Sequence, residues 1–302
     1  MGRVGEGVGY GGGIVEIGLA WAGGILLQSE RRSESAFMNR SALRSMVVAL
    51  FLALMIVPAS VVAQEPGNVP ETKAPAPTPK AAATAPSAWE IEHDKQMKED
   101  WPWLARFRED NMKLGMPAAG DNRVVFMGDS ITEAWKLEDS FPGKPFVNRG
   151  ISGQTTPQMV LRFRQDVIAL QPKVVVILAG INDIAGNTGT ETLTQIEDNI
   201  ASMTELANAH HIGVVLCSVL PAFDFPWRPG MTPAPKVLTL NTWIKAYAVD
   251  HGAVYVDYHT PMKDSRDGLP ATLSHDGVHP TPAGYAVMAP LAAAGIEKAL
   301  GQ

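Results

Sequence analysis

The stretch Val124–Trp135, which reads VVFMGDSITEAW, decides how this chain can be interpreted. It begins with the apolar run Val124–Met127, which has the length and composition of a strand buried on both faces. Gly-Asp-Ser follows directly, and a segment with a helical pattern comes next. Ser130 at this junction has two interpretations. It is either a helix N-cap, a position where Ser and Asp are common, or a nucleophile presented at the end of a strand.

Further apolar runs of strand length alternate with helical patterns along the chain. The predicted strands are Val124–Met127, Pro145–Val147, Val174–Ala179, Val214–Val219 and Ala253–Val256. The predicted helices are Trp89–Leu114, Thr156–Leu170, Glu191–His211, Pro235–His251 and one that starts near Pro282. This alternation, without an internal repeat, predicts one doubly wound α/β domain with a parallel sheet covered by helices. We expect the flavodoxin-like strand order 2-1-3-4-5, in which ligands bind beyond the carboxyl ends of the strands.

The composition excludes several classes of function. The chain has 302 residues, of which 46% are hydrophobic and 19% charged, with a formal net charge of -6. This mild acidity, without a basic stripe, argues against a nucleic-acid partner. Cys217 is the only cysteine, so neither an intramolecular disulfide nor a cysteine-based zinc site can form. Because Cys217 lies in an apolar run, we predict a buried structural thiol. No histidine–carboxylate cluster has metal-ligand spacing, and we expect no cofactor.

A secretory signal peptide is predicted over residues 38–63. The segment combines a basic start, an apolar core of about a dozen residues and small residues near its end, the pattern of a signal peptide. We expect cleavage between Ala63 and Gln64. The apolar core is too short to span a bilayer comfortably, and no cysteine stands at the cleavage point for a lipid anchor. We therefore expect export to the periplasm or the extracellular space, without a stable membrane anchor.

The segments around this signal have their own interpretations. Residues 1–37 precede it, and we interpret them as a mis-called N-terminal extension upstream of a true start at Met38. Residues 7–12 match the dinucleotide-binding pattern G-x-G-x-x-G, but no strand precedes them, so the match is accidental. Residues 64–87 are rich in Pro, Ala and Thr, which predicts an extended linker. The folded catalytic domain is expected over residues 88–302.

Polar segments follow three other predicted strands or precede the last helix. They are Asn148–Thr156 (NRGISGQTT), Gly180–Asp183 (GIND) and Ser274–Pro282 (SHDGVHPTP). Each segment alone is explained by turns and helix caps. The carboxyl ends of parallel strands meet at one edge of the sheet, so together these segments would surround Ser130.

Together, these segments supply the parts needed for acyl transfer. His279 can take the proton of Ser130, because imidazole titrates near neutral pH. Asp276, three residues earlier, can bind the other imidazole nitrogen on a turn and fix the tautomer. The backbone N–H groups of Ser130 and Gly153 and the side-chain amide of Asn182 can donate hydrogen bonds to a developing oxyanion.

Other titratable residues have simpler explanations. His275 is adjacent to Asp276 but precedes it, so it is the less favoured base. His210 and His211 end a helical pattern, where imidazole complements the helix dipole. We expect Asp129 to order its turn by hydrogen bonds, and Asp183 to cap a helix or support its neighbours.

The blocks FMGDSIT, NRGISG, GIND and DGVHP resemble the four conserved blocks of the GDSL or SGNH hydrolases. The resemblance covers the whole predicted domain, with all blocks in the family order. It implies a three-layer α/β/α flavodoxin-like fold with a five-stranded parallel sheet, and ester hydrolysis without a metal. It further implies Ser130 as the nucleophile, Gly153 and Asn182 as oxyanion donors, and Asp276 with His279 as an Asp-x-x-His pair. Because Ser130 lies outside a G-x-S-x-G elbow, the ordinary α/β-hydrolase fold is disfavoured.

A long aromatic segment, Pro221–Gly230, follows the fourth predicted strand. Its aromatic residues are Phe223, Phe225 and Trp227, and they either pack on the scaffold or form a wall of the substrate pocket. The second interpretation is open because functional variation is often found on such loops.

We therefore predict a secreted serine esterase. Its expected substrates are short-chain acyl esters, such as acetyl esters, of carbohydrates or small alcohols, because no long apolar lid is visible in the sequence. The first alternative is an acylhydrolase of the lysophospholipase or thioesterase type. An alternative of another class is a catalytically inactive cell-wall or carbohydrate-binding module on a flexible linker.

Overall fold

The apolar runs form the five-stranded parallel sheet that the sequence predicts. The order of the strands is β2-β1-β3-β4-β5, which confirms the flavodoxin-like topology. The strands are β1 (Val124–Gly128), β2 (Phe146–Gly150), β3 (Val174–Leu178), β4 (Gly213–Cys217) and β5 (Val254–Val256).

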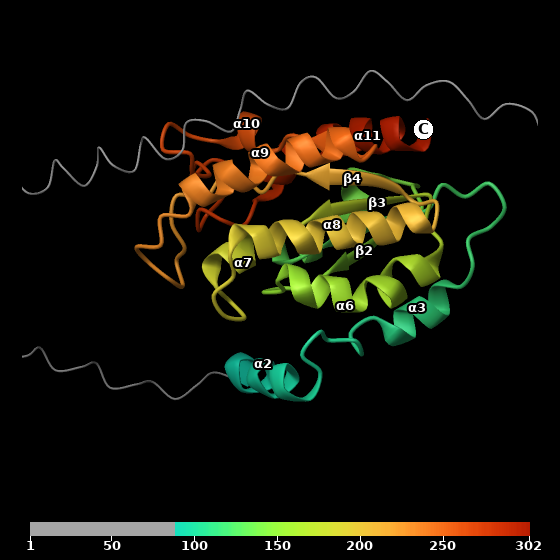
Figure 1. The fold of residues 1–302 in the computed structure, drawn as a ribbon, viewed down its shortest axis with the longest axis horizontal. Coiled ribbons are helices and arrows are strands. Elements are labelled where there is room, and N and C mark those ends of the chain that lie inside the picture. The colour runs from blue at the N-terminus through green and yellow to red at the C-terminus, as the bar shows by residue number, and fades with distance from the viewer. Residues whose placement is uncertain (1–87) are drawn as a thin grey trace, which may run out of the picture. The chain divides into compact units, whose positions relative to one another are not determined.

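The computed structural model describes residues 88–302 (Figure 1). The predicted N-terminal extension (1–37), signal peptide (38–63) and linker (64–87) lie outside the described residues. Among the described residues, no helix combines the length and apolar character needed to cross a bilayer.

Helices cover both faces of the sheet and make a three-layer α/β/α arrangement. On one face, α8 packs beside α6 and α9 (Figure 1), while α11 packs on β3, β4 and β5 and reaches α5. The longer helices are α6 (Thr156–Asp166), α8 (Leu193–Ala209), α9 (Ala234–Asp250) and α11 (Pro282–Leu300). The short helical elements are α4 (Ser130–Glu133), α5 (Leu137–Ser140), η1 (Ile168–Leu170), α7 (Ile181–Ala185) and α10 (His259–Met262).

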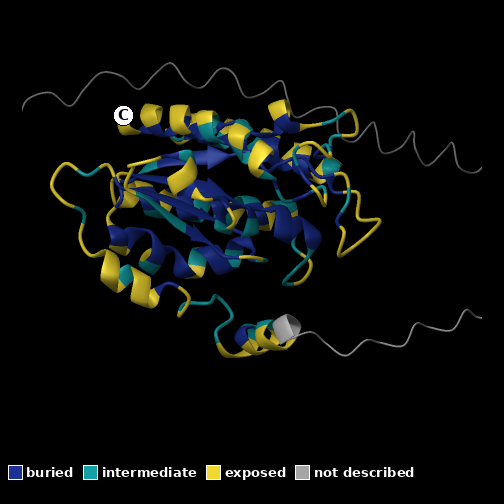
Figure 2. Cartoon of the chain, turned by 180° about the vertical axis from the view of Figure 1, so that it is seen from behind, coloured by how far each residue is buried: buried dark blue, intermediate teal, exposed yellow. Residues whose placement is uncertain are grey.

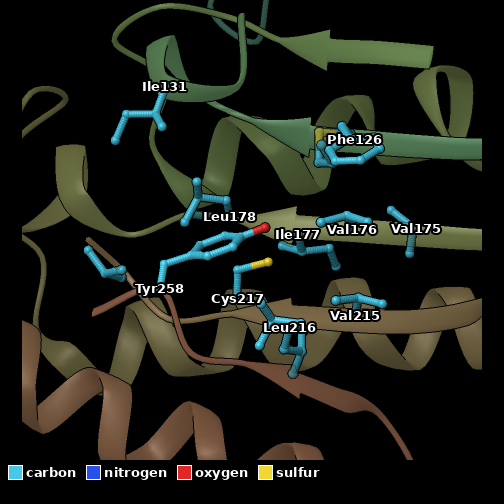
Figure 3. Close-up of a cluster of buried hydrophobic side chains, with 14 of the residues drawn as sticks. Phe126, Ile131, Val175, Val176, Ile177, Leu178, Val215, Leu216, Cys217 and Tyr258 are labelled. Atoms are coloured by element: carbon cyan, nitrogen blue, oxygen red, sulfur yellow. The ribbon is translucent and has the colours of Figure 1, made fainter. Parts of the chain in front are cut away.

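Burial of the central strands explains their uninterrupted apolar sequences. Every residue of β1 and β3 is buried, because helices exclude water from both faces of the sheet. Figure 2 shows buried residues concentrated in the sheet, with exposed residues on the outer surfaces of the helices. In the core, Cys217 lies beside Tyr258 (Figure 3). Burial raises the pKa of the Cys217 thiol to about 12, which confirms a buried, inert cysteine.

The single opening helix predicted over Trp89–Leu114 is wrong. The structure has two helices, α2 (Ala88–Glu99) and α3 (Arg108–Leu114), joined by a turn segment. Asp100 explains the interruption, because its carboxylate accepts hydrogen bonds from the backbone N–H groups of Leu104 and Ala105, both at 2.8 Å. These bonds offer the backbone an alternative to continued helix.

The ends of other predicted elements shift by one to four residues, and two of these shifts lie close to the site. β2 extends to Gly150, so the residues Asn148 and Arg149, expected in the following loop, belong to the strand. The helix predicted over Thr156–Leu170 ends at Asp166, and a separate 3₁₀ turn follows.

Candidate active site

Ser130 is the first residue of α4, directly beyond the carboxyl end of β1. The capping role belongs to its neighbour Asp129, whose Oδ1 accepts a hydrogen bond from the Ile131 N–H at 2.9 Å. Ser130 therefore does not cap the helix. Its Oγ lies 2.9 Å from the Nε2 of His279.

A close approach between α4 and β2 fixes the position of this turn. A Cβ atom at Gly150 would lie 2.1 Å from the backbone nitrogen of Glu133, so a side chain there would push the two elements apart. Asn148 closes the same contact, because its Nδ2 donates to the Thr132 carbonyl oxygen at 2.6 Å. Its Oδ1 accepts from the Gly150 N–H at 2.8 Å.

His279 and Asp276 form the pair that the sequence spacing predicts. The Nδ1 of His279 lies 2.6 Å from Oδ2 of Asp276. The other carboxylate oxygen, Oδ1, accepts from the backbone N–H of His279 at 2.8 Å and of Val278 at 2.9 Å. Ser274 adds a hydroxyl donor to Oδ1 at 3.1 Å. The turn therefore orients the carboxylate toward the imidazole.

These hydrogen bonds keep Asp276 ionised. Partial burial favours the neutral acid, but hydrogen bonds from the backbone and side chain of His279 and the backbone of Val278 outweigh it and lower the pKa of Asp276 to about 2. At neutral pH the imidazole therefore faces a full negative charge at Nδ1. An Nδ1–H that donates to this charge leaves Nε2 as the acceptor for the proton of Ser130.

Tyr285 joins the two halves of this arrangement. It lies on α11, which begins three residues after His279, and its hydroxyl donates to the Ile131 carbonyl oxygen of α4 at 2.7 Å. Its ring stacks on Trp135, with the ring centroids 5.3 Å apart. The histidine-bearing segment is thereby tied to the helix that begins with Ser130.

The predicted oxyanion donors converge beside Ser130. Gly153 has a φ of 78°, a left-handed conformation that glycine adopts without strain. Asn182 on α7 is buried; its Nδ2 donates to the Gln154 carbonyl oxygen at 3.0 Å, and its Oδ1 accepts from Asn187 at 2.9 Å. Among the described residues, the N–H groups of Ser130 and Gly153 have no acceptor. They are therefore available to an oxyanion.

A cavity of about 540 Å³ contains Ser130, Gly153, Asn182 and His279 in its lining. Polar amide and indole side chains form much of the remaining wall. These include Gln96, Trp103, Gln154, Gln158, Asn187 and Trp227.

The three aromatic residues of the loop after β4 separate into two groups. Trp227 lines the cavity, and its ring centroid lies 6.1 Å from that of His279. Phe225 is buried and stacks on Trp227, with the ring centroids 5.1 Å apart. Phe223 packs against the guanidinium of Arg266. Both phenylalanines line a different hollow. The structure therefore brings only Trp227, of these three, to the cavity with Ser130.

The remaining candidate residues lie apart from this cluster. His275 is exposed and is not part of the cavity lining. His210 and His211 follow α8 and line a separate hollow with Lys173. Within residues 88–302, no three His, Cys, Asp or Glu side chains gather as a metal-ligand set.

The sequence interpretation missed several residues that shape the site. Asn187, which orients the amide of Asn182, lies five residues further along the chain in a segment with no distinctive motif. Gln154 lies within the NRGISGQTT segment without a role that its sequence indicates, yet its carbonyl oxygen accepts a hydrogen bond from Asn182. The segment that follows α2 reaches the cavity because Gln154 and Gln158 donate to the carbonyl oxygens of Pro102 and Trp101. Only the folded structure shows these contacts, and the two that reach Pro102 and Trp101 span 52 and 57 residues of sequence.

Asp183 is a buried carboxyl group next to Asn182. Burial raises its pKa to about 7, although the hydroxyl and N–H of Thr156 donate to its Oδ1 at 2.5 and 2.9 Å. The neighbouring carboxyl group of Glu191 raises the pKa of Asp183 further. The folded protein therefore holds a proton on this group that the unfolded chain releases at lower pH.

We expect Asp183→Asn to flatten the dependence of stability on pH. The pKa of Asp183 is higher in the folded than in the unfolded protein, so its stabilisation is present in acid and is lost as the pH rises through about 7. An asparagine has no proton to lose there. Melting temperatures at pH 5 and pH 8 should differ less in the variant than in the wild type. The exposed carboxylate Asp198 offers the control Asp198→Asn; an unchanged pH difference in Asp183→Asn would contradict this account.

Comparisons with known proteins agree with this geometry. The sequence model of the GDSL-like lipase/acylhydrolase family matches residues 126–287. The crystal structure of a GDSL-like lipase from Bacteroides thetaiotaomicron is 46% identical, with a TM-score of 0.64, and the match covers 66% of this chain and 100% of that chain. An acetylxylan esterase of Geobacillus stearothermophilus is 25% identical over 214 residues, 59% of this chain and 93% of the relative. Another, from Xylanibacter ruminicola, is 25% identical over 248 residues, 69% of this chain but 48% of the relative.

Proposed function

Because the chain belongs to the GDSL-like lipase/acylhydrolase family and is a carboxylic ester hydrolase, we propose that it is a serine esterase that works through an acyl-enzyme. The observation that carries the proposal is the continuous chain of contacts from Ser130 Oγ to His279 Nε2, and from His279 Nδ1 to Asp276. A weak nucleophile, a base and a group that orients the base are then within hydrogen-bond reach of one another.

The first half of the reaction forms the acyl-serine. Ser130 Oγ attacks the ester carbonyl carbon while its proton moves to Nε2 of His279, and Asp276 stabilises the imidazolium that results. The carbonyl oxygen becomes an oxyanion that the N–H groups of Ser130 and Gly153 and the amide of Asn182 stabilise. The tetrahedral intermediate then expels the alcohol, which takes the proton from His279.

The second half returns the enzyme to its starting state. Water attacks the acyl carbon while His279 accepts one of its protons, and the oxyanion forms again between the same donors. Collapse of this intermediate breaks the bond between the acyl carbon and Ser130 Oγ. The serine recovers its proton from His279, and the carboxylic acid leaves.

Asn182→Ala should lower kcat by on the order of 10²–10³-fold, because it removes one donor to the transition-state oxyanion. KM should change much less, since the ground-state carbonyl oxygen needs this donor less than the oxyanion does. Steady-state kinetics on 4-nitrophenyl acetate, with a melting curve to confirm folding, measure both quantities. A folded variant with unchanged kcat would remove Asn182 from the oxyanion hole.

We further propose short acyl groups on a carbohydrate or small alcohol as the substrate. The cavity supports this proposal because amides and two indoles line it, groups that combine apolar faces with hydrogen-bonding atoms. The similarity to acetylxylan esterases points in the same direction. The alternative, an acylhydrolase of the lysophospholipase or thioesterase type, needs room for a long acyl chain.

Rates across ester substrates separate these candidates. The purified protein would be assayed on 4-nitrophenyl esters from acetate to dodecanoate, on acetylated xylo-oligosaccharides and on lysophosphatidylcholine. We expect kcat/KM to be highest for acetyl esters and to fall with acyl length. Highest activity on dodecanoate or lysophosphatidylcholine would overturn the short-acyl proposal. No activity on any ester would favour the inactive binding module.

Export through the predicted signal peptide at residues 38–63 is part of the same proposal. It would place the enzyme where O-acetylated polysaccharides are accessible. Sequencing the N-terminus of the mature protein tests it, and we expect a chain that begins at Gln64. A mature protein that retains Gly2 onward would contradict both the export signal and the start at Met38.

A further inference from the structure

Arg162 is a charged side chain with no exposure to solvent. It lies on α6, which begins two residues after Gln154. A guanidinium is costly to bury unless hydrogen bonds and opposite charge compensate for the lost hydration. Burial lowers the pKa of Arg162 to about 10, against the opposing effect of Asp166, and the group remains a cation at neutral pH.

The guanidinium bonds to the site on two sides. Its Nη2 donates to the Gly128 carbonyl oxygen at 3.0 Å, and its Nε donates to Oε1 of Gln154 at 2.5 Å. The remaining edge is paired with Asp166, one turn along α6, at 3.2 Å. A simple ion pair within the helix would bind Asp166 alone. Here two of the three guanidinium nitrogens bind residues outside the helix, Gly128 at the end of β1 and Gln154 in the loop that contains Gly153.

Both of these partners are adjacent to oxyanion donors. Gly128 is the last residue of β1, two residues before Ser130. Gln154 follows Gly153 in the chain, and its carbonyl oxygen accepts the hydrogen bond from Asn182. Ser130 is two residues from Gly128 and Gly153 is one residue from Gln154, while Asn182 donates a hydrogen bond to Gln154. All three donors are therefore close in the chain, or hydrogen-bonded, to a residue that Arg162 binds.

Asp166 makes the orientation of this guanidinium definite. Its Oδ2 binds Nη1 of Arg162, and its Oδ1 accepts from Asn111 at 2.8 Å. Asn111 in turn accepts from Arg149 on β2 at 2.7 and 2.9 Å. This network leaves the planar guanidinium one arrangement, in which Nη2 and Nε face Gly128 and Gln154. A lysine ammonium is a point charge and lacks this fork geometry.

We propose that Arg162 is a positioning residue that sets the spacing between the nucleophile turn and the oxyanion loop. It does not touch the substrate. It acts through Gly128 on Ser130 and through Gln154 on Gly153 and Asn182, so that the three donors converge on one point before the substrate binds. This role rests on the serine esterase mechanism proposed above and specifies what holds its transition-state site together.

Arg162→Lys is the first test, because it keeps a buried cation near Asp166 but cannot bind Gly128 and Gln154 together. We expect kcat on 4-nitrophenyl acetate to fall by on the order of 10–100-fold, because a displacement of a catalytic group by about 1 Å lowers the rate by that order. KM should change by less than about threefold. The double variant Arg162→Met/Asp166→Leu removes both charges and should show the same split between kcat and KM.

A tetrahedral analogue gives a readout that loss of stability alone would not move. Phenylboronic acid accepts an electron pair from Ser130 Oγ while the serine proton passes to His279, and no group leaves. The adduct places a boron-bound oxygen among the oxyanion donors. The inhibition constant of phenylboronic acid should therefore rise in Arg162→Lys by a factor close to the factor by which kcat falls. Thr204→Ala is the matched control, because Thr204 is buried on α8 and bonds only to the Ile200 carbonyl oxygen.

The outcomes decide the proposal in either direction. Folded variants of Arg162 with wild-type kcat, or with boronate affinity unchanged while kcat falls, would overturn it. If neither Arg162 variant folds, Gln154→Leu decides, because it removes the acceptor of Nε while leaving the ion pair with Asp166 intact. Wild-type kcat in folded Gln154→Leu would then refute the role. Activity of the wild type and its loss in Ser130→Ala test the esterase mechanism separately.

Discussion

Ser130→Ala should lower kcat by on the order of 10⁴–10⁶-fold, the range observed when the nucleophile of a serine hydrolase is removed. The variant keeps the donors of the oxyanion hole but has no atom that can form the acyl-enzyme. Its fold should be unaffected, because Asp129 and not Ser130 caps α4. Stopped assays with 4-nitrophenyl acetate, run at high protein concentration, measure the residual rate.

The structure also offers a control for Ser130→Ala. Ser152 lines the same cavity, but its hydroxyl bonds to Glu133 and not to His279. Ser152→Ala should keep most of the activity. Comparable losses in the two variants would mean that the reaction does not pass through Ser130.

His279→Gln should cause a loss of similar size, on the order of 10⁴–10⁶-fold in kcat, because the serine hydroxyl then has no base. Glutamine can still bond to Ser130 Oγ but cannot accept its proton at neutral pH. Residues that act as one unit are not additive, so the double variant Ser130→Ala/His279→Gln should be no slower than the worse single variant. Steady-state kinetics of the three proteins test this directly.

His275 is the matched control for the base. It is exposed and lies four residues before His279, on the other side of Asp276 in the sequence. His275→Gln should leave kcat within about twofold of the wild type, as expected for a surface substitution away from the reacting atoms. A large loss of kcat in His275→Gln, with near wild-type kcat in His279→Gln, would instead identify His275 as the base.

Much of the fold follows from local sequence pattern. The strand runs are uninterrupted because both faces of the sheet are buried, and that pattern needs no tertiary information to be seen. The prediction of one opening helix was wrong for a local reason that the hydrophobic pattern does not show. The carboxylate of Asp100 accepts hydrogen bonds from the backbone N–H groups of Leu104 and Ala105. Side chains that compete for the backbone in this way end helices at positions that hydrophobic periodicity does not mark.

The candidate site could be predicted in part, for a different reason. Ser130, Asn182 and the Asp276–His279 turn follow strands or precede a helix, and parallel topology gathers such positions at one edge. The supports of the site could not be found in this way. Arg162 looks like one polar residue among several on α6, and its burial depends on contacts with Gly128 and Gln154 that only the folded chain makes. Likewise, nothing in the loop sequence distinguishes Trp227, which lines the cavity, from the buried Phe225.

Covalent labelling with a fluorophosphonate tests the central claim most directly. The reagent is attacked at phosphorus by an activated serine and loses fluoride, so peptide mass spectrometry identifies the modified residue. We predict a single adduct on Ser130, formed as hydrolytic activity disappears, absent in Ser130→Ala and strongly slowed in His279→Gln. An active esterase that stays unlabelled at Ser130, or that loses activity through an adduct elsewhere, would contradict the assignment of the nucleophile.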